Sequence, residues 1–436
     1  MAVNASKAPS GGKGSEPGKA IGTRNVLFTG LVSLFTDLSS EMIYPLVPAF
    51  LRAMGVSMTT IGVIEGVAES TASLLRTVTG RLSDKLGKQK AFMLVGYGLS
   101  TFSKPFLFLA TGWPMVLGVR FADRVGKAIR TPARDALLST SVDGARKGWA
   151  FGVHRGMDRL GAVGGPLLAL LVLHLFKNVD VPSLAPAGTG LPARLARHLC
   201  MLGGNKVRLV FLFSFIPAAL ALAFIPFTRE AARAARASSG ARRSGLGSPA
   251  FVLFLVASIV FTLGNSSNAF LILKAREAAL PVTMIPVIWV VYNITCTISS
   301  PIFGTLSDRV GRAPVIAVSF IYYAIIYALF GFTQSLSGVW TLFAAYGLYY
   351  GLSEGVFRAY IADLVAADYR ATAYGVFNTG VGLALVPASV IFGAVWDAFG
   401  SKWAFLMSAA FSLVGFVIFL WGLTAARRAR GAGQPG

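Results

Sequence analysis

The segment GRLSDKLGKQK, residues 80–90, occurs a second time as GTLSDRVGRAP at residues 304–314, 224 residues later. Two further pairs keep nearly the same offset and the same order: AFGVHRG at 150–156 with AYGVFNT at 373–379, and SSE at 39–41 with SSN at 266–268. Repeated segments in one order at one spacing indicate internal duplication. The chain is therefore expected to contain two similar halves.

The composition is that of an integral membrane protein. Of the 436 residues, 55% are hydrophobic and 13% are charged, whereas a soluble protein carries about 25% charged residues. A membrane-spanning helix needs about 20 mostly apolar residues. Twelve runs meet this need: 26–50, 58–80, 91–111, 114–138, 148–176, 207–227, 250–273, 283–304, 314–333, 339–363, 371–396 and 402–424. We therefore predict an all-α membrane protein with twelve transmembrane helices in two pseudo-symmetric six-helix halves.

The basic residues predict the orientation. The net charge is +22, and most Lys and Arg lie in alternate links between apolar runs, as cytoplasmic loops do under the positive-inside rule. This pattern argues against nucleic-acid binding. Both termini are expected in the cytoplasm, and the long link 177–206 is interpreted as external. The predicted divisions are a disordered cytoplasmic tail 1–25 with no cleavable signal peptide, an N-terminal half 26–228, a central cytoplasmic linker 229–248, a C-terminal half 249–424 and a cytoplasmic tail 425–436.

Charged residues interrupt the fourth apolar run. The segment GVRFADRVGKAIRTPARDALL, residues 118–138, places most of its charges on one stripe of a helix that turns about 100° per residue. Such a stripe must face protein or a water-filled cavity. Arg130, Arg134 and Asp135 are expected near the cytoplasmic surface, and Arg120 and Arg124 deeper in the membrane.

Basic residues outnumber acids on this helix and the next, which carries HRGMDR at 154–159. A buried excess of positive charge is costly unless an anion offsets it, and the Arg fork suits carboxylate or phosphate. The predicted substrate-binding residues are Arg120, Arg124, Arg155, Arg159, Lys274 and Arg358. The alternative is structural ion pairing, for example Asp123 with Arg155 or Asp158 with Arg124.

Acidic residues in other spans are candidates for proton transfer, because intramembrane carboxylates are rare and commonly functional. The predicted proton-coupling residues are Asp37, Glu41, Glu65, Glu69, Asp123, His154, Asp158 and Glu354. Pairing of these acids with Arg76 or with the basic helices is the alternative. The Tyr-rich segment 346–351 is interpreted either as a drug pocket or as ordinary packing. The two Cys and three His residues show no disulfide or metal-site spacing, and no nucleophile–base set or P-loop is present, so neither an enzyme nor a resident cofactor is predicted.

The repeated segment resembles the loop signature of the major facilitator superfamily. The resemblance implies a conformational latch, with a tight turn at the second Gly and an Asp able to accept hydrogen bonds from a helix N-terminus. Its residues are Gly80, Asp84, Lys85, Gly87 and Lys88, with Asp308 and Arg309 in the second copy. Gln89 and Ala313 depart from the usual basic residues.

The fifth run is similar to the antiporter motif of exporters in this superfamily, through Gly152, Gly161, Gly165 and Pro166. The motif implies export by exchange, here with protons. Its two final Gly positions are Ala169 and Leu170. Arg120 also matches the Arg of a motif of the fourth helix, where Asp123 and Arg124 replace Gln and Gly and so add charge.

Three segments resemble a bacterial subgroup that includes iron-citrate efflux transporters and magnetosome-associated carriers: DLSSEMIYPLVP (37–48), DRVGKAIRTPARDALL (123–138) and FGVHRGMDRLGAVGGP (151–166). The resemblance implies proton-coupled export of a metal–carboxylate complex, with iron(III)-citrate as the expected substrate. We thus expect a monomer in the bacterial inner membrane that contacts lipid and a small anion. The alternatives are a multidrug/proton antiporter and, in another class, a membrane receptor or scaffold that does not transport.

Overall fold

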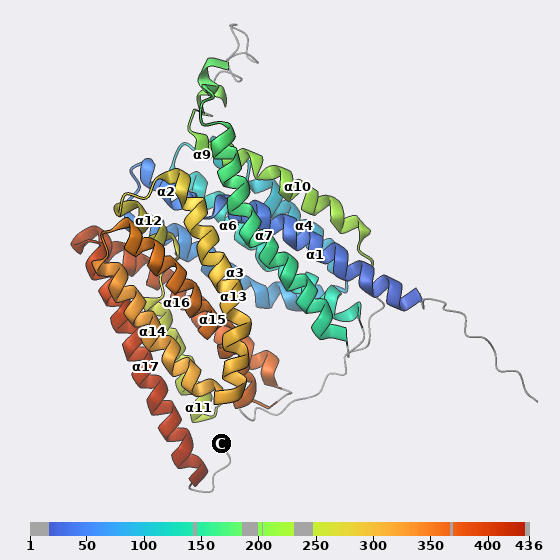
Figure 1. The fold of residues 1–436 in the computed structure, drawn as a ribbon. Coiled ribbons are helices and arrows are strands. Elements are labelled where there is room, and N and C mark those ends of the chain that lie inside the picture. Colours follow the sequence, from blue (N-terminus) through green and yellow to red (C-terminus); the bar gives the residue numbers. More distant parts are fainter. Residues whose placement is uncertain are drawn as a thin grey trace, which may run out of the picture.

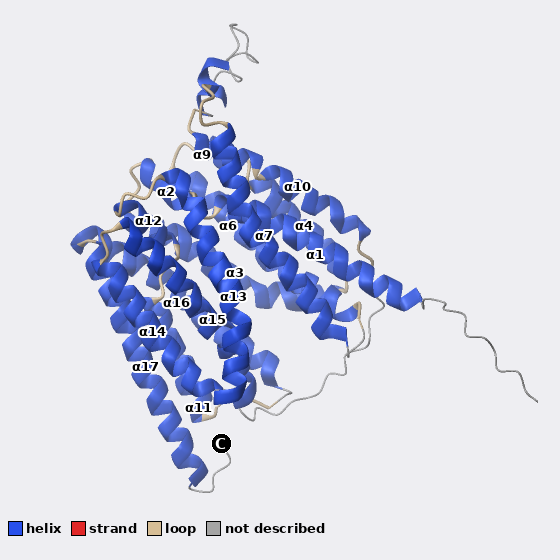
Figure 2. Ribbon diagram, viewed as in Figure 1, coloured by secondary structure: helices blue, strands red, loops and turns tan. Residues whose placement is uncertain are grey.

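The computed structural model describes residues 17–142, 146–184, 199–202, 204–230, 247–366 and 369–431. Within these ranges all regular structure is helical (Figures 1 and 2). The first-half helices are α1 (Pro17–Ile43), α2 (Val47–Ala53), α3 (Met58–Leu86), α4 (Gln89–Ser103), α5 (Phe106–Leu109), α6 (Trp113–Thr140), α7 (Lys147–Leu175), η2 (Val181–Leu184), α9 (Lys206–Phe213), α10 (Phe215–Phe224) and η3 (Ile225–Phe227). The second-half helices are α11 (Pro249–Gly264), α12 (Ala269–Glu277), η4 (Val282–Met284), α13 (Ile285–Val310), α14 (Arg312–Phe332), α15 (Leu336–Leu364), α16 (Arg370–Phe399) and α17 (Ser401–Gly431).

Each of the twelve predicted apolar runs contains one of these helices or a closely spaced pair of them. In the described part of the chain, nine helices are long and apolar enough to cross a membrane. The helices α3, α6 and α15 are as long but are not among these nine. The all-α membrane architecture predicted from the sequence is confirmed. Most of the predicted central linker, residues 231–246, lies outside the described residues.

Several runs that read as continuous in the sequence are broken in the structure. The break between α1 and α2 spans residues 44–46, the break between α11 and α12 spans residues 265–268, and α4 ends at Ser103, immediately before Lys104 and Pro105. Pro lacks a backbone donor and its ring clashes with the preceding helical turn, which accounts for the break at Pro105. Irregular backbone at membrane depth is tolerated where protein or a water-filled cavity surrounds it. These breaks therefore mark the interior of the molecule.

The same packing pattern appears in both halves. In the first half α3 packs on α6, α1 on α10, and α4 on both α6 and α10. In the second half α13 packs on α15, α11 on α17, and α14 on both α15 and α17. The sequence duplication thus corresponds to a duplication of helix packing.

The two halves meet along α3 and α16, with smaller contacts between α2 and α12 and between α7 and α13. At the start of α3, the Asp397 carboxylate accepts hydrogen bonds from Met58 N at 3.0 Å, Thr59 N at 2.8 Å and Thr59 Oγ1 at 2.7 Å. The contact between the halves along α3 and α16, here called the seam, also includes the hydrogen bond from Ser70 Oγ to Gly382 O. Figure 1 shows the halves together around α2 and α12 and farther apart at the opposite ends of α7 and α13.

Tyr-rich packing fills the second half. Tyr323 and Tyr327 stack with ring centroids 4.0 Å apart, and Tyr346 is fully buried against both. Tyr349 is 3% exposed. The packing interpretation of the segment 346–351 is therefore confirmed for Tyr346, whereas Tyr349 also borders a cavity of the second half.

Candidate functional site

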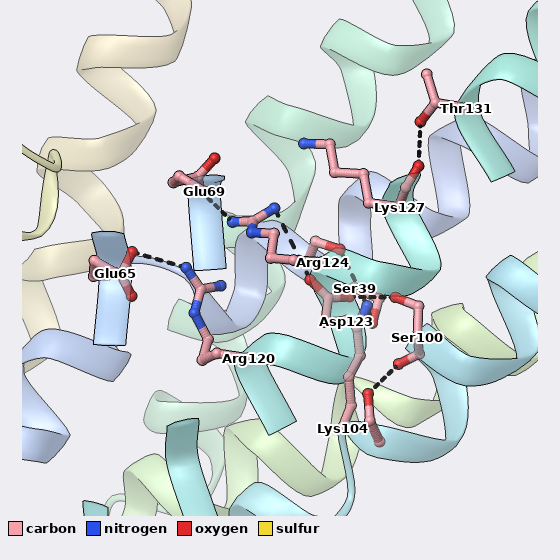
Figure 3. A network of polar contacts seen from close by, with 12 residues as sticks. Ser39, Glu65, Glu69, Ser100, Lys104, Arg120, Asp123, Arg124, Lys127 and Thr131 are labelled. Atoms are coloured by element: carbon pink, nitrogen blue, oxygen red, sulfur yellow. Dashed lines mark hydrogen bonds and ion pairs between the residues drawn. The ribbon is translucent and has the colours of Figure 1, made fainter. Parts of the chain in front are cut away.

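Two ion pairs join α3 to α6 in the interior of the first half (Figure 3). Arg120 Nη2 lies 2.8 Å from Glu65 Oε2, and Arg124 Nη2 lies 2.8 Å from Glu69 Oε1. Side chains four residues apart lie on the same face of a helix, so the two arginines of α6 meet the two glutamates of α3 in register. Both basic residues that were predicted to bind substrate from α6 thus already have acidic partners.

The pair of Arg120 and Glu65 is the more deeply buried of the two. Glu65 is 1% exposed and Arg120 is 5% exposed. The Arg120 guanidinium lies 5.3 Å from the centre of the Tyr44 ring, and Glu65 Oε2 also accepts a hydrogen bond from Ser267 Oγ at 3.3 Å. Because Ser267 lies in the break between α11 and α12, this pair links the two halves.

A second cluster of polar side chains lies around the break between α4 and α5. Lys104 is 3% exposed and its Nζ donates to Ser39 Oγ at 2.7 Å and to Ser40 Oγ at 3.1 Å. Asp123 accepts a hydrogen bond from Ser100, and its Oδ2 lies 3.9 Å from Arg124 Nη1. Lys104 was not among the predicted site residues, and its signal in the sequence is a Lys–Pro pair inside an apolar run.

Arg130 does not lie at the surface, so that expectation is wrong. It is 5% exposed, and its guanidinium lies 4.8 Å from the centre of the Tyr97 ring. The cause is the close approach of α4 and α6, because a methyl group on Gly126 would lie 2.5 Å from Gly96 O. Two facing glycines let the backbones touch, and α4 covers this part of α6. Farther along α6, the expectation holds better for Asp135, whose side chain is 45% exposed.

The acids of α1 lie against α7 through two glycines of the predicted antiporter motif. A methyl group on Gly161 would lie 2.5 Å from Leu34 O and 2.9 Å from Asp37 Cβ. One turn later, a methyl group on Gly165 would lie 2.6 Å from Leu38 O and 2.8 Å from Glu41 Cβ. The motif spacing therefore sets how close Asp37 and Glu41 come to α7.

These acids have partners other than arginine. Glu41 Oε2 accepts a hydrogen bond from Trp289 Nε1 of α13 at 2.7 Å, and the Asp37 carboxyl group faces that of Asp158 on α7 within hydrogen-bonding range. Nearby, His154 Nε2 lies 2.9 Å from Ser33 Oγ. The predicted proton-coupling residues Asp37, Asp158 and Glu41 thus gather where α1, α7 and α13 meet.

A cavity of about 250 Å³ lies between these two groups of charges. Acids from α1 and α3 line it, and so do five cations from α6 and the end of α4: Lys104, Arg120, Arg124, Lys127 and Arg130. The second half contributes Asn268, Trp289, Tyr292 and Asn293. Both halves thus enclose one small, strongly polar cavity. Among the described residues, no group of three His, Cys, Asp or Glu side chains is placed to hold a metal ion.

Four of the predicted substrate-binding residues lie elsewhere. Arg155 is exposed, and Arg159 Nη2 lies 3.4 Å from Glu354 Oε2 across the halves, with Arg358 Nη2 4.0 Å from the other oxygen of Glu354. Lys274 Nζ lies 2.9 Å from Glu277 Oε2 and 3.0 Å from Ser401 Oγ, at the end of the second half near α12. These four residues are not among the groups that line the central cavity.

The alternative ion pairs of α6 with α7 do not form between the predicted partners. Asp123 pairs with Arg124, and Arg124 pairs with Glu69, rather than with Arg155 or Asp158. The reason is the helix arrangement: α7 packs along α1, whereas α6 packs along α3 and α4. Although α6 and α7 are consecutive in the chain, they are not the helices that pack most closely together in the bundle.

The repeated loop segment forms the predicted tight turn in its first copy. Gly87 ends α3 with φ of +65°, a left-handed conformation that suits glycine. In the second copy, Asp308 Oδ1 lies 3.4 Å from Arg312 Nη2, and Arg312 also pairs with Asp363 of α15. Asp397, which was not among the predicted residues, caps a helix of the other half, α3.

The glycines of α7 give a matched test. We expect Gly161→Leu to lower the free energy of unfolding by about 1–3 kcal/mol, as overpacking of a close interface does, because its Cβ would overlap Leu34 O. Gly152→Leu is the control, since a methyl group at Gly152 meets nothing within 4 Å. Denaturant titration in lipid–detergent micelles measures both. Equal effects of the two substitutions would contradict a packing role for Gly161.

The chain is similar over most of its length to known proteins of one family. The family model described as Major Facilitator Superfamily matches residues 29–273 and 250–435. An uncharacterized MFS-type transporter of Methanocaldococcus jannaschii is 32% identical over 410 residues, which cover 92% of this chain and 95% of that protein.

Two further similarities concern either the fold alone or only part of the chain. The crystal structure of a bacterial homologue of the human lysosomal transporter Spinster, in an inward-facing and unoccupied conformation, has a TM-score of 0.72 at 13% identity and covers 94% of this chain and 98% of that one. At this identity the likeness concerns the fold alone. The multidrug resistance protein MdtG of Proteus mirabilis is 30% identical over 135 residues, which are 30% of this chain and 33% of that protein.

Proposed function

The chain is a multi-pass membrane transporter of the major facilitator superfamily, and on this premise we propose that it exports a small anionic substrate in exchange for protons. The observation that carries the proposal is the set of five cations around a 250 Å³ cavity where the two halves meet. Carriers of this architecture bind substrate near the membrane midplane, between their two halves. Buried cations that form no ion pair are stabilised by a bound anion.

We assign the proton to the acids of α1 and α7 and the anion to the cations of α6. Asp37 and Glu41 lie at the contacts of α1 with α7 and α13, so a change in their charge acts on helices of both halves. A proton and an anion attract each other, so exchange cannot rest on competition for one charged site. Exchange requires that the proton and the anion be carried in opposite half-cycles, so occupation of the acids of α1 and α7 by protons must disfavour occupation of the anion site.

Iron(III)-citrate is the substrate we propose to test first. The support is the resemblance of residues 37–48, 123–138 and 151–166 to the iron-citrate efflux subgroup, together with a polar cavity whose cations suit carboxylates. Iron then enters only as part of the transported complex. We place the protein in the bacterial inner membrane as a monomer with cytoplasmic termini, so that the end where the halves diverge faces the cytoplasm.

The test is uptake of radioactive iron, supplied as iron(III)-citrate, into inside-out proteoliposomes with an acidic lumen. We expect accumulation up to about tenfold per pH unit for each proton exchanged, since one pH unit is worth about 1.4 kcal/mol. Protein-free liposomes and a protonophore are the controls, and citrate without iron is the parallel substrate. Accumulation driven only by an acidic exterior would contradict exchange, and accumulation of citrate alone would contradict the iron complex.

The alternative function is multidrug/proton antiport. It is favoured by the partial likeness to a multidrug resistance protein and by a second cavity of about 460 Å³, which Phe261, Tyr349, Phe357 and Phe377 border. Because Arg76, Glu354 and Arg358 border it as well, a cavity of that size suits drugs that carry both apolar and charged groups. Transport of a cationic dye by the same proteoliposomes, with no transport of iron(III)-citrate, would support it.

A further inference from the structure

Two of the five cavity cations are already neutralised. Arg120 pairs with Glu65, and Arg124 pairs with Glu69 at 2.8 Å. The other three cations, Lys104, Lys127 and Arg130, form no ion pair with an acid of the described residues. An anion that entered the cavity would therefore have to break a buried pair to reach Arg120, but would break none to reach these three.

The three cations differ in their remaining polar contacts. Arg130 Nη1 is buried and has no hydrogen-bond partner among the described residues, although the side chain is 5% exposed and borders the cavity. Lys104 is held by two serine hydroxyl groups. Figure 3 shows the Lys127 amine with no marked interaction, on the same side of α6 as the Arg124 guanidinium.

The acids nearby, among the described residues, lie beyond ion-pair distance of these three cations. Around Asp123 stand Lys104, Arg124 and Arg130, and Glu69 faces Arg124 and Lys127. The cavity lining as a whole holds these four cations with Arg120, and four acids, Asp37, Glu41, Glu69 and Asp123, while Glu65 pairs with Arg120. Glu41 accepts a hydrogen bond from Trp289 of α13, and Asp37 faces Asp158 of α7. An unpaired guanidinium in a buried cavity is costly unless a ligand satisfies it.

We propose that Lys104, Lys127 and Arg130 hold the anionic group of the substrate, and that this group is a dianion such as a pair of carboxylates or a phosphate. The paired arginines Arg120 and Arg124 then act as structural neighbours of the site. This inference rests on the proposed function, and it replaces the predicted binding arginines with three residues that the sequence did not single out for binding.

The first experiment measures the electrostatic potential of the cavity without any assumption about the substrate. A single cysteine, Ser40→Cys, is placed beside Lys104 in a chain whose Cys200 and Cys296 are replaced by serine. The rates of reaction with an anionic and a cationic thiosulfonate reagent are compared. We expect the ratio of anionic to cationic rate to fall about tenfold or more in Lys127→Gln and in Arg130→Gln, as loss of a unit charge nearby predicts.

Lys177→Gln is the matched control, because Lys177 is exposed and lies outside the cavity, and it should leave the ratio unchanged. Arg130→Lys keeps the charge and should retain most of the ratio. An unchanged ratio in Lys127→Gln and Arg130→Gln would overturn the proposal. Folding of each variant is checked by its elution as a single species in detergent.

The second experiment separates this inference from the function on which it rests. Proteoliposomes are tested with citrate, succinate, acetate and inorganic phosphate, each with and without a pH gradient. The proposal expects the KM of a transported dianion to rise about tenfold or more in Lys127→Gln, with a smaller change for acetate. Anion transport with an unchanged KM in that variant would overturn the site and keep the function. A changed thiosulfonate ratio, with no gradient-driven transport of any anion, would keep the site and overturn the function.

Discussion

Replacing Glu65 by leucine is expected to lower the free energy of unfolding by about 3–5 kcal/mol, the usual cost of removing one partner from a buried ion pair. The substitution leaves Arg120 charged, 5% exposed and without its 2.8 Å partner. The Tyr44 ring at 5.3 Å offsets only part of that loss, since a desolvated cation–π contact is worth about 2 kcal/mol. Denaturant titration in lipid–detergent micelles measures the change.

The double substitution Glu65→Leu/Arg120→Met distinguishes a lost pair from a poorly tolerated leucine. With both charges removed, no uncompensated charge stays buried, and apolar replacement of a buried pair is often neutral. We therefore expect the double variant to recover most of the loss. A single variant as stable as the parent would show that Arg120 reaches water or another acid. Transport by a stable double variant would show that this pair is structural and carries no proton.

Replacing Gly62 by leucine is expected to disrupt the seam between the halves. A methyl group at this position would lie 2.1 Å from Ser389 O, and one at Gly393 would lie 2.3 Å from Met58 O. Both obstacles are backbone atoms, which cannot turn away as a side chain does. Overpacking costs about 1–3 kcal/mol or more, which corresponds to a shift of about 5- to 150-fold in the equilibrium between conformations.

The shift should favour conformations in which α3 and α16 are apart, and transport should fall because the cycle needs both. Spin labels at positions 53 and 284, at the converging end of the two halves, should report a longer distance in Gly62→Leu. Gly98→Leu is the matched control, since a methyl group there meets nothing within 4 Å. Equal transport by the two variants, with equal label distances, would contradict the assignment of this seam to a moving contact.

The sequence predicted the parts of the molecule that depend on local chemistry. Apolar runs long enough to span a bilayer, a repeated loop and the turn at Gly87 require only residues that are neighbours in the chain. The glycines of α7 belong here too, because close helix packing selects small residues at helical spacing. For the same reason, the confinement of the α6 charges to one stripe was visible from the 100° turn per residue.

The charge pairing could not be read from the chain, because it depends on which helices touch. The sequence left two pairings open, α6 with its chain neighbour α7 or the acids of the first two spans with the basic helices, and the bundle forms the second by placing α6 against α3. That choice decides that Arg120 and Arg124 are neutralised by Glu65 and Glu69, and that Arg130 is buried beneath Gly96. The break before Pro105 adds Lys104 to the cavity. By itself, the sequence determined a duplicated helical membrane transporter with an excess of buried positive charge. Only the tertiary structure decided which cations are left without an acid, because the energy of a charge depends on the groups within a few ångströms of it in space.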